Sequence, residues 1–167
     1  MESLADQLDL PRVSGEELLG TWYIVRTTFP MWRDGKNSHP SLNYGRIEGD
    51  GSRLTDRVVY RRNGKTRQIR GIDRQDPKLS CHFTWRGRGL LALLTSDWYV
   101  VDLDQGAGVM AIYFSKTLFT PAGMDIAASS PTPDPAAIEA CVGRLRASAS
   151  LRPHLDALVE IDHRLSR

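Results

Sequence analysis

Gly20-Thr21-Trp22-Tyr23 opens the first strand-like run of this chain and decides how the rest is interpreted. Glycine has no Cβ, so it lets the backbone turn tightly into a strand. After this tetrapeptide, short apolar runs alternate with turn residues, and the spacing of apolar residues becomes helical only beyond Pro131. The order predicts an all-β chain that ends in a helical segment.

Length and composition fit one globular domain. The chain has 167 residues, of which 41% are hydrophobic and 25% are charged. This length allows a sizeable core, and this composition is ordinary for a folded protein. A net charge of +2 is too small to require a nucleic-acid partner. No apolar run approaches the length of a membrane span, so membrane contact is not expected.

Consecutive hairpins predict the architecture. Eight strand-like runs cover residues 21–28, 42–48, 54–62, 65–73, 79–86, 96–103, 109–117 and 124–128. Asn63-Gly64 and residues 104–108 are hairpin turns, and residues 29–41 are expected to form a loop. Hairpins without intervening helices predict an up-and-down antiparallel meander. Eight strands suffice to close a barrel that holds one small ligand.

The C-terminal part is expected to pack on the barrel. Asp134 can cap a helix, and Pro135 fits the first helical position. Ile138, Cys141, Val142 and Leu145 then share one face. A second helix is expected over 151–165. We therefore divide the single domain into a barrel over 1–130 and a helical segment over 131–167.

The chain resembles the lipocalins, a family of calycin β-barrels, in Gly20-Thr21-Trp22 and in the order of its elements over residues 15–147. Residues 99–104 followed by 111–113 resemble the second lipocalin motif. Residues 115–117 resemble the third, with Lys116 where the family has an arginine. The resemblance implies an eight-stranded barrel with a helix on its outside, plugged at the closed end by Gly20 and Trp22. It also implies a small apolar molecule inside.

Alternation along the strands predicts which side chains face the interior. The expected ligand-binding residues are Val58, Phe83, Trp85, Trp98, Val100 and Ala111, with Trp32 and His39 from the 29–41 loop. Arg26, Tyr60 and Tyr113 are the polar groups expected inside, and they are the candidate catalytic residues. Alternatively, Arg26 pairs with Asp56 or Asp102 in a purely structural role. A barrel with a solid core and no cavity is also an alternative.

The connections at the open end carry many bases and one apolar segment. The bases are Arg33, Lys36, His39, Arg61, Arg62, Lys65, Arg67, Arg86, Arg88 and Lys116. They suit a ligand with an anionic head, or they form a solvated rim. The apolar residues 87–94 are expected to cover the lumen as a lid. They alternatively extend a strand inward, or anchor the protein to a membrane or partner.

The primary functional hypothesis is carriage or sequestration of a small hydrophobic molecule. The alternative is a cofactor-free cyclase or isomerase of polyketide- or terpenoid-like metabolism that works by orienting its substrate. A partner-binding module is a third option. Neither a cofactor nor a metal is expected, because the four histidines lack metal-ligand spacing.

The cytoplasm is the expected location, because residues 1–10 carry acids and no signal-peptide core. Cys81 and Cys141 are either two buried thiols or a disulfide that ties the helix to the barrel.

Overall fold

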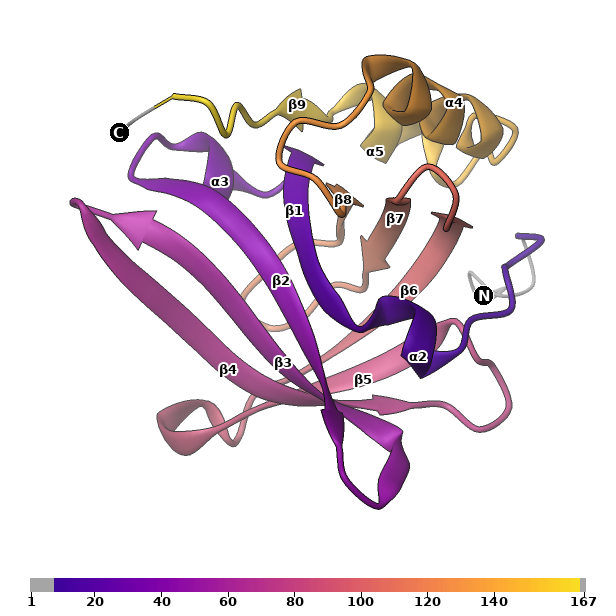
Figure 1. Cartoon of the computed structure of the whole chain (residues 1–167). Coiled ribbons are helices and arrows are strands. Elements are labelled where there is room, and N and C mark those ends of the chain that lie inside the picture. Colours follow the sequence, from indigo (N-terminus) through magenta and orange to yellow (C-terminus); the bar gives the residue numbers. More distant parts are fainter. Residues whose placement is uncertain (1–7, 166–167) are drawn as a thin grey trace.

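The hairpin at Asn63-Gly64 sets the register of the sheet. In the computed structural model, which describes residues 8–165, β3 (Asp50–Arg62) and β4 (Lys65–Gln75) pair without interruption from Arg62↔Lys65 to Arg53↔Arg74. Asn63 and Gly64 have φ values of 52° and 71°, and a tight two-residue hairpin turn requires such positive angles. This hairpin forms the long magenta arm of Figure 1.

Eight strands close into an antiparallel barrel, as the sequence predicts (Figure 1). The others are β1 (Gly20–Thr27), β2 (Asn37–Ile47), β5 (His82–Gly87), β6 (Thr95–Asp104), β7 (Val109–Phe114) and β8 (Gly123–Ala128). Each strand pairs with the next along the chain, and β1 pairs with both β2 and β8. Closure leaves none of the eight as a free edge along its full length.

Short helices join or flank the strands. They are α2 (Gly15–Leu18), α3 (Pro30–Arg33), the 3-10 helix η1 (Gly89–Leu91), α4 (Pro135–Leu145) and α5 (Arg152–Asp156). The prediction that 29–41 is only a loop is wrong, because α3 and the start of β2 lie within it. No helix in residues 8–165 combines the length and the hydropathy needed to cross a membrane. Residues 1–7 of the acidic N-terminal segment lie outside the described part.

α4 packs on the outer wall of the barrel, as predicted. The Asp134 side chain accepts a hydrogen bond from the Ala136 N–H, and Pro135 starts the helix. The four apolar residues that share a face are buried against β6 and β7 (Figure 1). The molecule thus has two apolar clusters, one inside the barrel and one between the barrel and the helices.

The second helix predicted over 151–165 is present, but its predicted length is wrong. α5 spans five residues, and β9 (Val159–Glu160) then pairs with Arg26 and Thr27 of β1. The Ile161 N–H also donates to the Val25 carbonyl at 2.9 Å. The unpaired backbone of β1 offers these hydrogen bonds, and they outweigh the helical spacing of the local sequence.

Candidate ligand-binding site

The barrel holds a cavity of about 760 Å³ that opens at the end bearing α3 and η1. This volume lies in the range of small-molecule sites. Its inner wall is mainly apolar and aromatic, with Ile24, Leu42, Val58, Ile69, Trp85 and Trp98 among its members. The alternative of a solid core is therefore wrong.

Several predicted ligand-binding residues lie at this cavity. Trp32, Val58, Trp85 and Trp98 line it. Phe83 and Val100 are fully buried in the same interior cluster. The ring of Tyr60 meets that of Trp32 edge to face, with 5.3 Å between the ring centroids. Their contacts with a ligand stay predictions.

Arg26 does not point into the barrel. The pairing of β1 with β8 shifts register between Ile24 and Arg26, and such a bulge moves the following side chains to the opposite face. Arg26 instead forms an ion pair with Glu139 of α4, with 2.5 Å between Nη2 and Oε1. Neither predicted acidic partner is used, and Asp102 pairs with Arg144. The inward placement of Arg26 is therefore wrong.

The predicted facing of β7 is wrong as well. Ala111 and Tyr113 belong to the cluster beneath the helices, whereas Met110, Ile112 and Phe114 face the interior. Both faces of β7 are apolar because α4 covers the outer one, so polarity does not distinguish them.

His39 is not among the residues that line the described cavity, and its contact with a ligand stays a prediction. Its ring packs edge-on against that of His163, with the centroids 5.8 Å apart.

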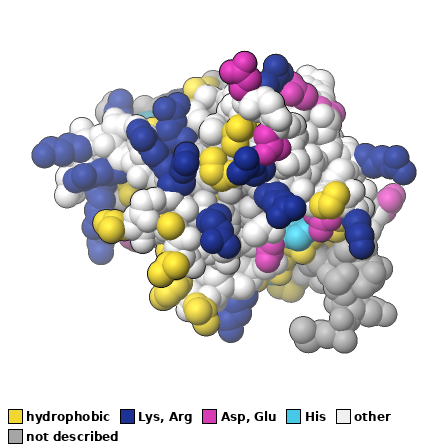
Figure 2. Space-filling view, turned by 90° about the horizontal axis from the view of Figure 1, so that it is seen from below, with side chains coloured by type: hydrophobic (Ala, Val, Ile, Leu, Met, Phe, Trp, Pro, Cys, Tyr) yellow, Lys and Arg dark blue, Asp and Glu magenta, His cyan; other side chains and the backbone are white. Residues whose placement is uncertain are grey.

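The wall of the cavity itself carries few bases. Of the ten expected bases, only Lys116 lines the described cavity. Leu93 and Leu94 belong to the wall, but Leu90 and Leu93 are almost fully exposed, so the 87–94 segment borders the opening and does not extend a strand inward. Figure 2 shows hydrophobic side chains in separate groups among Lys and Arg side chains on the face seen from below.

Three carboxyl groups inside the barrel were not among the predicted site residues. Asp56 on β3, Asp73 on β4 and Asp125 on β8 are 7%, 0% and 2% exposed. Asp56 and Asp125 line the cavity, together with Tyr44, which lies opposite Asp56 on β2. Acids this deeply buried are rare unless they are paired, so they mark the polar end of the cavity.

Each carboxyl group has few hydrogen bonds. Trp98 Nε1 donates to Asp73 Oδ1 at 2.8 Å, and Thr27 Oγ1 donates to Asp125 Oδ1 at 2.6 Å. Asp56 and Asp73 lie on the same face of the neighbouring strands β3 and β4, and the two carboxyl groups influence each other's pKa. Asp56 Oδ1 and Asp73 Oδ2 have no partner.

Burial changes the acidity of these groups. Burial raises the pKa of Asp56 to about 7, and it raises the pKa of Asp125 to about 7. The pKa of Asp73 rises well above its usual value through burial and then through the charge of Asp56. Burial, followed by the charges of all three acids, raises the pKa of Tyr44. The interior therefore favours neutral, protonated carboxyl groups unless a cation accompanies them.

The hairpin register could have revealed the pair. Counting outward from Asn63-Gly64 places Asp56 opposite Gly71 and Leu54 opposite Asp73, so the two acids share a face. Asp125 lies two residues before Ala127 on β8, so its side chain shares the face of Ala127, which is the barrel interior. The sequence therefore contains the signal that places Asp56 and Asp73 together.

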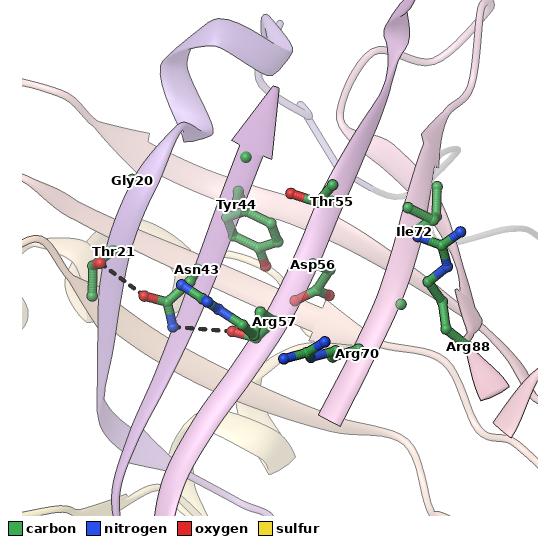
Figure 3. Close-up of a pocket in the computed structure, with 12 residues that line it drawn as sticks. Gly20, Thr21, Asn43, Tyr44, Thr55, Asp56, Arg57, Arg70, Ile72 and Arg88 are labelled. Carbon is green, nitrogen blue, oxygen red and sulfur yellow. Dashed lines mark hydrogen bonds between the residues drawn. The ribbon is translucent and has the colours of Figure 1, made fainter. Parts of the chain in front are cut away.

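A second hollow, of about 500 Å³, lies over β1 to β4, and its lining includes the buried residues Tyr44 and Asp56 as well as exposed residues of the outer surface (Figure 3). Thr21 Oγ1 donates to Asn43 Oδ1 at 2.8 Å, and Asn43 Nδ2 donates to the Arg57 carbonyl at 3.0 Å. Arg57 and Arg70 lie directly opposite each other, and both are exposed. Solvent screens exposed charges, so this hollow is a weaker candidate than the interior.

The described residues 8–165 contain no group of three His, Cys, Asp or Glu side chains arranged to hold a metal ion. Cys81 and Cys141 are both buried and free. Cys81 belongs to the cluster inside the barrel and Cys141 to the one beneath α4, so the barrel wall separates the two thiols.

The fold is that of a lipocalin-like calycin barrel. The cockroach allergen Per a 4 superimposes with a TM-score of 0.70 at 16% sequence identity, over 93% of this chain and 91% of the allergen. Lobster apocrustacyanin A1 gives a TM-score of 0.64 at 12% identity, over 87% of this chain and 77% of that one. The siderocalin Ex-FABP gives a TM-score of 0.63 at 13% identity, over 90% of this chain and 97% of the siderocalin chain.

No family model matches the sequence, and no curated protein matches it at a significant level. The identities to the solved structures are low, so the likeness concerns the fold alone.

Proposed function

We propose that this protein encloses a small hydrophobic molecule in its barrel, for carriage or sequestration. The observation that carries the proposal is the 760 Å³ cavity with Trp32, Trp85 and Trp98 in its wall. Each Å² of apolar ligand surface removed from water contributes about 25 cal/mol, so a ligand of drug-like size gains several kcal/mol before its binding costs.

The character of the wall argues against an anionic head. Such a head would meet Asp56 and Asp125, whereas Lys116 is the one base among the described lining residues. Burying an anionic head without a compensating base costs free energy. We therefore expect ligands without an acidic group.

A pair of neighbouring substitutions tests where the ligand lies. Val58 lines the cavity, and Val59, the next residue on β3, faces the other side of the sheet. Val58→Trp should fill the cavity and weaken binding of the neutral dye diphenylhexatriene at least tenfold. Val59→Trp should leave it within about twofold. Dye fluorescence, excited directly, gives both affinities. Equal affinities in the two variants would show that the dye binds elsewhere.

A second candidate function is a cofactor-free cyclase or isomerase. It is favoured by the protonatable carboxyl groups of Asp56 and Asp125, because buried groups with shifted pKa values in a cavity often transfer protons. These two acids replace Arg26 and Tyr113 as the groups to test, and Tyr60 stays as a neighbour of Trp32.

The enzymatic function can be tested by incubating the protein with acyclic polyene precursors and following isomers by chromatography. Asp56→Asn should slow conversion at least a hundredfold while binding changes less than tenfold. Recovery of every precursor unchanged would contradict catalysis. We also propose a cytoplasmic location, which the two free thiols support.

A further inference from the structure

We propose that the molecule held in this cavity carries a basic nitrogen, and that Asp56 receives it as an ammonium group, with Asp73 and Asp125 nearby. The inference rests on the proposed function and names the chemical class of the ligand: an apolar or aromatic amine.

The first support is the missing cation. Asp56, Asp73 and Asp125 come from three different strands, and all three influence the same residue, Tyr44. None of them forms an ion pair with a Lys, Arg or His of the described residues. Burying acids without a compensating cation costs free energy, and Asp56 Oδ1 and Asp73 Oδ2 also lack a hydrogen-bond partner. A ligand that brings a positive charge would compensate for this cost.

The second support is the unpartnered oxygen. Asp56 Oδ1 is buried, has no hydrogen-bond partner, and belongs to a residue that lines the cavity. An oxygen in this state accepts a hydrogen bond from whatever donor the ligand presents. An ammonium group brings three hydrogen-bond donors and a full positive charge, whereas a hydroxyl group brings one donor and no charge.

The third support is the aromatic surroundings. Tyr44 and Trp85 line the cavity beside Trp98, which is itself stacked on Tyr44 and on Phe83 with centroid distances of 5.7 Å and 4.5 Å. Aromatic faces attract cations, and this attraction grows where water is excluded. The same rings also contact the apolar part of the ligand, so one cavity serves both ends of an aromatic amine.

The charge balance sets the expected proton count. The titratable groups that face the cavity or border it are Tyr44, Asp56, Asp73, Asp97, Asp125 and Lys116. Below about pH 7 the carboxyl groups of Asp56 and Asp125 are mostly protonated. When an ammonium group binds, one of these carboxyl groups ionises to face it. The complex keeps the ammonium charge, gains one carboxylate, and releases up to one proton to the buffer.

Three probes with the same ring test the inference. They are 1-naphthylmethylamine, 1-naphthylmethanol and 1-naphthylacetate, each titrated into the full chain by calorimetry at pH 6.5. The amine should bind at least tenfold more tightly than the alcohol, and the acid should bind most weakly. Titration in two buffers of different ionisation enthalpy should show proton release for the amine and none for the alcohol.

Two matched variants locate the interaction. Asp56→Asn should lower the amine affinity to that of the alcohol and leave the alcohol affinity unchanged. Asp104→Asn removes an acid that is 41% exposed and does not line the cavity, and it should change the amine affinity less than twofold. If Asp56→Asn does not fold, the pH dependence of the wild type serves instead. Amine affinity should then rise between pH 5.5 and 8 while alcohol affinity stays constant.

The outcomes separate the two proposals. Equal affinity for amine and alcohol, with binding still blocked by Val58→Trp, would overturn the amine inference and leave the enclosed hydrophobic ligand intact. Tighter binding of the acid would overturn it as well. If neither the three probes nor the neutral dye binds, the proposed function fails and the amine inference fails with it.

Discussion

Trp22 is held by both packing and a hydrogen bond. Its side chain is 4% exposed, and its Nε1 donates to the Leu18 carbonyl at 2.8 Å, which joins β1 to α2. The sequence motif predicted a plug at this position, and the geometry explains why a tryptophan suits it. The ring fills the closed end, and its one polar atom finds a backbone acceptor.

Trp22→Ala should therefore lower the free energy of unfolding by about 3–5 kcal/mol, as large aromatic truncations in cores do. Trp22→Phe keeps most of the ring but loses the hydrogen bond, so it should cost less. Urea denaturation followed by circular dichroism measures both. A loss below about 1 kcal/mol for the alanine variant would show that the ring does not stabilise the barrel.

At the scale of single elements, turn chemistry was the most reliable guide. Asn63-Gly64 placed β3 and β4, and Asp134-Pro135 placed α4. The prediction of which side chains face the interior failed where simple alternation along a strand no longer applied. A bulge after Ile24 reversed the parity of β1, and α4 made both faces of β7 apolar. Neither effect is visible in a local stretch of sequence, because each depends on a distant partner.

Arg26 gives the element-scale prediction. Its ion pair with Glu139 links β1 to α4, but the Glu139 side chain is 62% exposed, so solvent screens the interaction. Arg26→Gln should lower the free energy of unfolding by less than about 1 kcal/mol and leave the affinity for the neutral dye unchanged. Thermal denaturation and dye titration test the two parts. A large loss of dye affinity would restore a direct role in the cavity.

For the whole molecule, the buried acids govern how stability depends on pH. The pKa of Asp56 and of Asp125 is about 7 in the folded state against a usual value of 3.8. Between these values the folded state holds protons that the unfolded state has released, so stability falls as pH rises from about 4 to about 7. Hydrogen bonds with Ser52 and Arg53 lower the pKa of Asp50 to about 2. Asp50 therefore has the opposite effect below about pH 4, where it makes stability rise with pH.

We expect the urea midpoint to be higher at pH 4.5 than at pH 8, with a difference of a few kcal/mol in unfolding free energy. Asp125→Asn removes one of the titrating groups while still offering an acceptor to Thr27, so the difference between the two pH values should shrink. Burial lowers the pKa of His163, which opposes the trend near pH 6 but is common to both proteins. A midpoint independent of pH would show that the interior acids are hydrated.

β9 has a consequence for self-association. β1 pairs with β2 only over Gly20 to Tyr23, and its remaining backbone on that side would face water if Val159 and Glu160 did not pair with it. Bare strand edges recruit strands from other molecules, and a two-residue strand is too short to recruit one in turn. The C-terminal segment thus covers a strand edge that would otherwise promote aggregation. Cutting the chain between α5 and β9 would leave a barrel that dimerises or forms fibrils through β1.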